Sequence, residues 1–153
     1  MGAVILGLSD HDDSDTVVSY AIDAATQDAK PLFVIYTLDE RLLEGLSEHL
    51  TDHVFMGEKA GDDIRSTVEN EYFERAKDRI AQIHRYAEQR GIKVDGIIRT
   101  GRFSKELLRY ARMRDGDMIV IPKERCSKVR RWLFGSYEEE IRRGAHCPVQ
   151  AVE

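Results

Sequence analysis

The feature that most constrains the fold of this chain is a series of short, mostly apolar runs that alternate with amphipathic segments. An apolar run of about 4–8 residues is typical of a strand buried on both faces of a sheet. Strands of this kind need helices on both faces to cover them, so their alternation with helical patterns predicts an α/β fold with a parallel sheet. The predicted strands are Ala3–Leu8, Leu32–Leu38, Ile92–Thr100, Asp117–Ile121 and Pro148–Val152.

The segments between these strands carry helical patterns with recognisable ends. Ser14 and Asp15 can cap a helix, and the pair Lys30-Pro31 stops it. Gly91 ends a second helix. Residues 39–67 are the least regular part, because glycines stand among charges there, and we expect an irregular, mobile segment. The later predicted helices are Glu69–Arg90, Ser104–Arg114 and Ser136–Arg143.

Length and composition place the chain among globular proteins. The 153 residues fit one domain, spanning 1–153, and the net charge of −5 argues against nucleic acid as a partner. No apolar run approaches the roughly 20 residues that cross a bilayer, and the N-terminus lacks the pattern of a signal peptide. With only Cys126 and Cys147 and no secretion signal, we expect a reduced, cytoplasmic protein without a membrane partner.

The carboxyl ends of parallel strands are where an open α/β sheet binds its ligands. We therefore expect a site where the loop Ser9–Asp15 meets the loop Pro122–Gly135, beside Thr37 at the end of the second strand. The later loop contains the basic sequence KERCSKVRR and ends in Gly135-Ser136, which begins a helix. Helix N-termini and basic side chains both favour anions, so the loop predicts a phosphate site.

In these features the chain resembles the universal stress protein family, over nearly its whole length. The resemblance rests on Ser9-Asp10 after the first strand, on Gly135-Ser136 and on the ending His146-Cys147-Pro148-Val149. It implies a Rossmann-like fold, similar to the adenine nucleotide alpha hydrolases. The fold would be an open five-stranded sheet in the order 3-2-1-4-5 with helices on both faces. It also implies a homodimer that pairs through the last strand, at Pro148, Val149, Gln150, Ala151 and Val152.

In nucleotide-binding members of the family, the loop after the fourth strand looks like the pattern Gly-x2-Gly-x9-Gly-Ser/Thr. Here the spacing is kept, but Pro122 and Arg125 replace the first two glycines. Proline has no N–H to donate to a phosphate, and the Arg125 side chain narrows the approach to the backbone. Lys123 and Arg125 offer charged contacts in exchange. The candidate site residues are Ser9, Asp10, Thr37, Lys123, Arg125, Gly135 and Ser136.

Each of these features has a simpler interpretation. The basic loop can be solvated, and Asp10 can bind local amides. Asp12, Asp13 and Asp15 can lie in solvent or pair with cations instead of holding a metal. We also expect Arg125 or Lys128 to reach Asp12, Asp13 or Asp10 and occupy the cleft. His49 and His53 stand four residues apart, but two ligands on one helix make a poor zinc site, so we assign no metal ligand and no catalytic residue.

The sequence thus favours a non-catalytic stress-response or signalling module with an altered, weak nucleotide or anion cleft and an unidentified protein partner. The alternative is a genuine ATP- or AMP-binding switch, with or without Mg²⁺, in which arginine and lysine side chains replace the glycines. A third reading, a nucleotide hydrolase, lacks a general base or metal site that any spacing nominates.

Overall fold

The computed structural model describes residues 2–10, 13–39, 58–124 and 136–153, with the backbone alone described over 58–68. Its strands form one five-stranded sheet in the order β3-β2-β1-β4-β5, and each neighbouring pair is parallel. Both the fold class and the strand order predicted above are confirmed. The strands are β1 (Ala3–Ser9), β2 (Leu32–Asp39), β3 (Val94–Gly101), β4 (Gly116–Pro122) and β5 (Val149–Val152).

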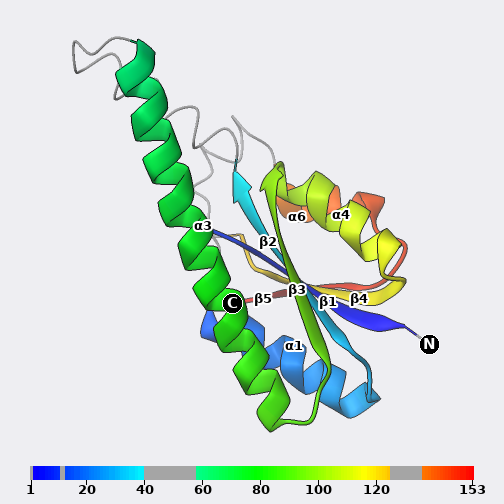
Figure 1. Ribbon diagram of the computed structural model, residues 1–153. Helices are drawn as coiled ribbons and strands as arrows, with labels where there is room; N and C mark the ends of the chain where they lie inside the picture. The colour runs from blue at the N-terminus through cyan, green and yellow to red at the C-terminus, as the bar shows by residue number, and fades with distance from the viewer. Residues whose placement is uncertain (1, 11–12, 40–57, 125–135) are drawn as a thin grey trace.

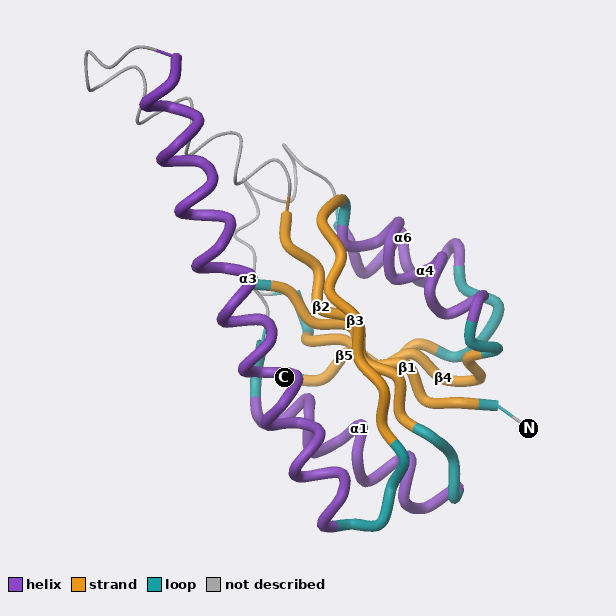
Figure 2. The backbone as a smooth tube through the Cα atoms, in the orientation of Figure 1, coloured by secondary structure: helices purple, strands orange, loops and turns teal. Residues whose placement is uncertain are grey.

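Helices cover both faces of this sheet (Figure 1). Two of them, α1 (Asp15–Asp28) and α3 (Glu58–Gln89), lie on one face, and α4 (Phe103–Met113) and α6 (Tyr137–Gly144) lie on the other. The tube in Figure 2 shows the same three layers. Among the described residues, no helix is both long enough and apolar enough to cross a bilayer.

The ends of α1 form as the sequence predicts. Ser14 has extended backbone angles and its Oγ accepts the Val17 N–H at 3.3 Å, which satisfies a donor that the helix leaves without a partner. At the other end Ala29 adopts the left-handed conformation, with φ of 52°, and its N–H donates to the last carbonyls. Pro31 follows at once and prevents the helix from continuing.

The helix α3 is longer than predicted. It begins at Glu58, whereas the sequence placed its start at Glu69 and expected irregular backbone up to residue 67. The expectation of irregular backbone is therefore wrong for residues 58–67, which are helical. It is also wrong for Asp39, which ends β2. Residues 40–57 lie outside the described part of the chain. Gly61 is one of the glycines among charges that favoured an irregular segment. A single glycine inside a helix costs only about 1 kcal/mol, and good helix formers such as Glu58 and Ala60 surround it.

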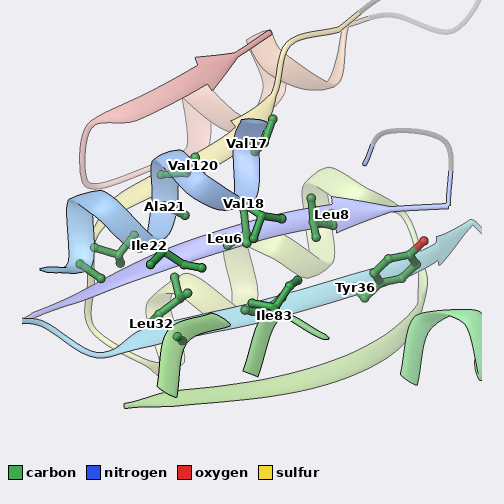
Figure 3. Packing of buried hydrophobic residues seen from close by; sticks show 14 of the residues in the cluster. Leu6, Leu8, Val17, Val18, Ala21, Ile22, Leu32, Tyr36, Ile83 and Val120 are labelled. Atoms are coloured by element: carbon green, nitrogen blue, oxygen red, sulfur yellow. The ribbon is translucent and has the colours of Figure 1, made fainter. Parts of the chain in front are cut away.

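The core consists of two clusters, one on each face of the sheet. Side chains alternate along β1, so Leu6 and Leu8 pack under α1 and α3, and Ile5 packs under α4. Figure 3 shows the first cluster, with Val18 and Ile22 of α1 above the strand. Because all three strand side chains are fully buried, β1 has no solvent-facing side over this stretch.

Gly7, on the α4 face of β1, gives a test of this packing. A Cβ atom at Gly7 would lie 2.9 Å from Cδ2 of Leu107 and 3.2 Å from Cζ of Phe103. Since the Leu107 side chain is itself fully buried, it has little room to move. We expect Gly7→Val to lower the free energy of unfolding by about 1–3 kcal/mol, measured by urea denaturation. An unchanged midpoint would show that α4 is not packed this tightly on β1.

Candidate functional site

Two hydroxyl side chains lie next to each other where β1 and β2 end. Ser9 and Thr37 are partners in the parallel register of these strands, and both are buried, Thr37 to 1% exposure. Their positions alternate with those of Leu8 and Tyr36, which places them on the α4 and α6 face. The Thr37 Oγ1 is buried and has no hydrogen-bond partner among the described residues. A buried hydroxyl without a partner is costly, which makes this position a candidate for ligand contact.

The N-terminus of α6 lies at the same end of the sheet. Ser136 is its N-cap, and its Oγ accepts the Glu139 N–H at 3.3 Å. The Ser136 hydroxyl in turn donates its proton to Oε2 of Glu124 at 2.6 Å. Both side chains are 8% exposed. The predicted anion ligand Ser136 is therefore already engaged, and its partner is a carboxylate of the same chain.

A second contact reinforces this connection between β4 and α6. The Tyr137 Oη donates to the carbonyl oxygen of Pro122 at 2.8 Å, and the Tyr137 ring packs edge-on against Phe103, with 5.1 Å between centroids. The carbonyl of Pro122 thus binds within the chain, and this residue has no N–H. Together with the contact between Glu124 and Ser136, the tyrosine fixes the helix start against the end of the strand.

Lys123, another predicted anion ligand, lies toward β5. Its backbone N–H donates to Val152 O at 2.8 Å, and its Nζ lies 3.3 Å from Glu153 Oε1. The lysine side chain is 54% exposed, so this ion pair is weak. Other residues named from the sequence lie outside the described part of the chain; they are Asp12, His49, His53, Arg125, Cys126, Lys128 and Gly135.

The acidic loop after β1 is held by an arginine from α3. Arg79 reaches Asp13 through its Nε and Nη2 groups, at 2.9–3.0 Å, and its Nη1 lies 2.9 Å from Asp15. The guanidinium is only 13% exposed. Burial lowers the pKa of Arg79, but hydrogen bonds and charges from the two aspartates outweigh it and raise the pKa overall. We expected Arg125 or Lys128 to neutralise this loop, and the described partner of Asp13 is Arg79 instead.

Tyr36 reports the electrostatics of the same region. It lies beyond Leu32 toward the end of β2, and its hydroxyl marks the rim of the cluster in Figure 3. Burial and, after it, the charges of Asp13 and Asp10 raise the pKa of Tyr36 to about 12, while the charges of Arg79 and Arg75 act to lower it. Asp10, a predicted site residue, is half-buried and lies close enough to Tyr36 to contribute. The acids that follow β1 therefore lie close enough to Tyr36 to disfavour its ionised form.

Two residues of this region were missed by the sequence analysis. Arg79 lies 66 residues from Asp13 along the chain, and no local pattern connects them. Glu124 did carry a signal, because it is the one acid in the basic sequence KERCSKVRR. A single acid among five cations indicates a specific hydrogen-bond or ion-pair partner, and the partner of Glu124 is the Ser136 hydroxyl.

The role of Arg79 can be tested with a conservative change. Arg79→Lys keeps the charge but loses the planar fork that binds Asp13 and Asp15 together. We expect it to lower the free energy of unfolding by about 1–2 kcal/mol, because hydrogen bonds between charged groups contribute about that much. The matched control is Arg75→Lys, on the same helix but exposed, which should change stability by less than about 0.5 kcal/mol. Equal effects in urea denaturation would contradict the assigned role.

The chain is similar to proteins of known family along its whole length. The model of the universal stress protein family matches residues 1–153. The chain is 26% identical to universal stress protein YxiE of Bacillus subtilis over 147 residues, covering 92% of this chain and 93% of that one. It is 23% identical to universal stress protein MJ0531 of Methanocaldococcus jannaschii over 150 residues, covering 98% and 81%.

Solved structures of the family share the fold. Universal stress protein UspA from Lactobacillus plantarum superposes with a TM-score of 0.72 at 19% identity, covering 99% of this chain and 97% of that one. A universal stress protein in complex with cAMP gives 0.67 at 16% identity, with the same coverage. One from Archaeoglobus fulgidus in complex with dAMP gives 0.56 at 15%, covering 100% and 98%. With the family model matching from the first residue to the last, the chain belongs to the universal stress protein family.

Proposed function

We propose that this protein is a non-catalytic stress-response module that binds an adenine nucleotide weakly at the carboxyl ends of β1, β2 and β4 and acts as a homodimer. The observation that carries the ligand proposal is the buried Thr37 hydroxyl, which has no hydrogen-bond partner among the described residues and lies beside Ser9. The complexes of other family members with cAMP and dAMP support an adenine nucleotide as the occupant.

The chemistry of the described side chains supports a binding role over a catalytic one. The strand ends present the hydroxyls of Ser9, Thr37 and Ser136, and the Ser136 hydroxyl donates to a carboxylate, Glu124, a group that is ordinarily a weaker base than the imidazole that activates a serine nucleophile. Of the histidines in the described part, His84 pairs with Glu88 on α3. The other, His146, lines a cavity near the start of β4, at the opposite end of the sheet.

The affinity should be low because, among the described residues, Pro122 and the Ser136 side chain have no donor free for a phosphate. Pro122 has no N–H, and its carbonyl is taken by Tyr137. The Ser136 hydroxyl already donates its hydrogen bond to Glu124. A lost hydrogen bond to a charged group weakens binding by about 10- to 150-fold. Lys123 and Arg125 supply charge in exchange, and the nucleotide is ATP or AMP, with or without Mg²⁺.

Restoring the two family glycines tests this proposal. We expect calorimetry to show weak ATP and AMP binding by the natural chain, purified without added nucleotide. The variant with Pro122→Gly and Arg125→Gly should bind ATP at least about tenfold more tightly, because it regains one donor and room for a phosphate. The two single changes separate these effects. Tight binding by the natural chain that the double change destroys would instead assign Arg125 as a ligand and make the protein a nucleotide switch.

The dimer proposal rests on the exposed edge of the sheet. β5 is the outermost strand, and within the described chain it pairs with β4 alone. The carbonyls of Pro148 and Val152 accept from β4, so by alternation the backbone groups of Val149 and Ala151 point outward. An edge of this kind pairs readily with a second strand. Two copies meeting edge to edge would close a two-fold dimer.

A proline on this edge distinguishes the dimer from a monomer. Ala151→Pro removes an outward N–H and leaves the ladder between β4 and β5 intact. We expect it to raise the dissociation constant of the dimer at least about tenfold in analytical ultracentrifugation. The control Gln150→Ala alters an exposed side chain and keeps every backbone donor. Deleting Val149–Glu153 should give a monomer or an aggregate. A monomeric natural chain, or a dimer indifferent to Ala151→Pro, would rule out this interface.

A further inference from the structure

We propose that Glu124 determines the ligand specificity of this cleft, so that it prefers adenosine, which carries no charge, to ATP. The inference rests on the proposed function and concerns the end of the same site where α6 begins. Its basis is the carboxylate that the chain itself places against the N-terminus of that helix. Glu124 occupies the position from which a bound phosphate would accept a hydrogen bond from the Ser136 hydroxyl and face the N-terminus of α6.

The geometry leaves the Ser136 hydroxyl nothing further to donate. A hydroxyl can donate one hydrogen bond, and the Ser136 hydroxyl donates it to Oε2 of Glu124 at 2.6 Å. The oxygen also accepts the Glu139 N–H, so Ser136 both donates and accepts within the chain. A phosphate that approached Ser136 would have to displace Glu124 before it gained a hydrogen bond from this side chain.

The charged carboxylate of Glu124 pairs with no cation in the described part of the chain. Among the described residues, no lysine, arginine or histidine forms an ion pair with it, although the side chain is 8% exposed. Its stabilisation comes from the Ser136 hydroxyl and from the partial positive charge at the start of α6. An arriving phosphate would compete for both and would bring like charge close to a carboxylate in a poorly solvated place.

The other acids of this helix start behave differently. The first turn of α6 also carries Glu138 and Glu140, and each is held by an arginine, Arg142 for the first and Arg102 for the second. The Ser104 hydroxyl donates to Glu140 as well, at 2.6 Å. Glu139 is exposed to solvent. Glu124 therefore stands apart from these residues as the buried acid whose bound partner is a hydroxyl.

Binding measurements with two probes and two variants test the proposal. Adenosine and ATP, without divalent cations and at matched ionic strength, are titrated into the natural chain, Glu124→Gln and Glu139→Gln. The glutamine at 124 keeps the size and an acceptor for Ser136 but removes the charge. We expect the natural chain to bind adenosine more tightly than ATP. Glu124→Gln should bind ATP about tenfold more tightly and change adenosine affinity less than about twofold, with both unchanged in Glu139→Gln.

The outcomes separate the inference from the function on which it rests. If both probes bind and Glu124→Gln leaves the ATP affinity unchanged, the inference fails and the adenine site stands. If neither probe binds any of the proteins, the proposed function fails and the inference falls with it. Tighter binding of ATP than of adenosine by the natural chain would also overturn the inference. This comparison needs only the natural chain, so it can be made even if Glu124→Gln does not fold. The titrations are then repeated with Mg²⁺, and ATP binding that appears only with the cation and disappears in Glu124→Gln would make Glu124 a metal ligand and contradict the inference.

Discussion

The arrangement of this molecule depends on the burial of β1 between β2 and β4, with helices on both faces. Leu6, Leu8 and Ile5 of this strand are fully buried, so every element next to it is fixed by packing. The chain leaves β1 toward α1 on one face and leaves β4 toward α6 on the other. The two strand ends therefore lie side by side while the segments that follow them diverge. This divergence creates the place where a parallel sheet can receive a ligand.

Several charged groups that the structure describes around that place are paired within the chain. Arg79 takes Asp13 and Asp15, and Lys123 takes Glu153. Glu124 binds a hydroxyl instead of a cation, which leaves its negative charge directed at the start of α6. The buried Thr37 hydroxyl on β2 contrasts with these pairs. The proposed site would thus combine a helix start at which Glu124 already binds Ser136 with a strand end at which the Thr37 hydroxyl has no partner among the described residues.

The sequence was sufficient for the sheet because burial on both faces leaves a local pattern. The strands β1, β2 and β4 contain short apolar runs, and the ends of α1 follow from the side chain of Ser14 and the ring of Pro31. The start of α3 could not be read in this way, since a single glycine lowers helix stability too little to end a long helix. For the candidate site, the order of the strands predicted Thr37 and the resemblance rested on Ser9 and Ser136, but contacts between residues far apart in the sequence could not be predicted. Arg79 is the clearest case, because nothing near it indicates that it binds the loop after β1.

The length of α3 has a mechanical consequence for the loop that Arg79 holds. At 1.5 Å per residue its 32 residues span about 48 Å, whereas a strand of eight residues spans about 26 Å. The backbone of α3 consequently extends past the sheet (Figure 1). Glu58 lies about 32 Å along the helix axis from Arg79. If the helix pivots as a rigid rod where Arg79 grips the loop, a tilt of about 5° displaces its first residue by about 3 Å. A small tilt of α3 at its contact with the loop thus becomes a displacement about the size of an atom at the far end of the helix.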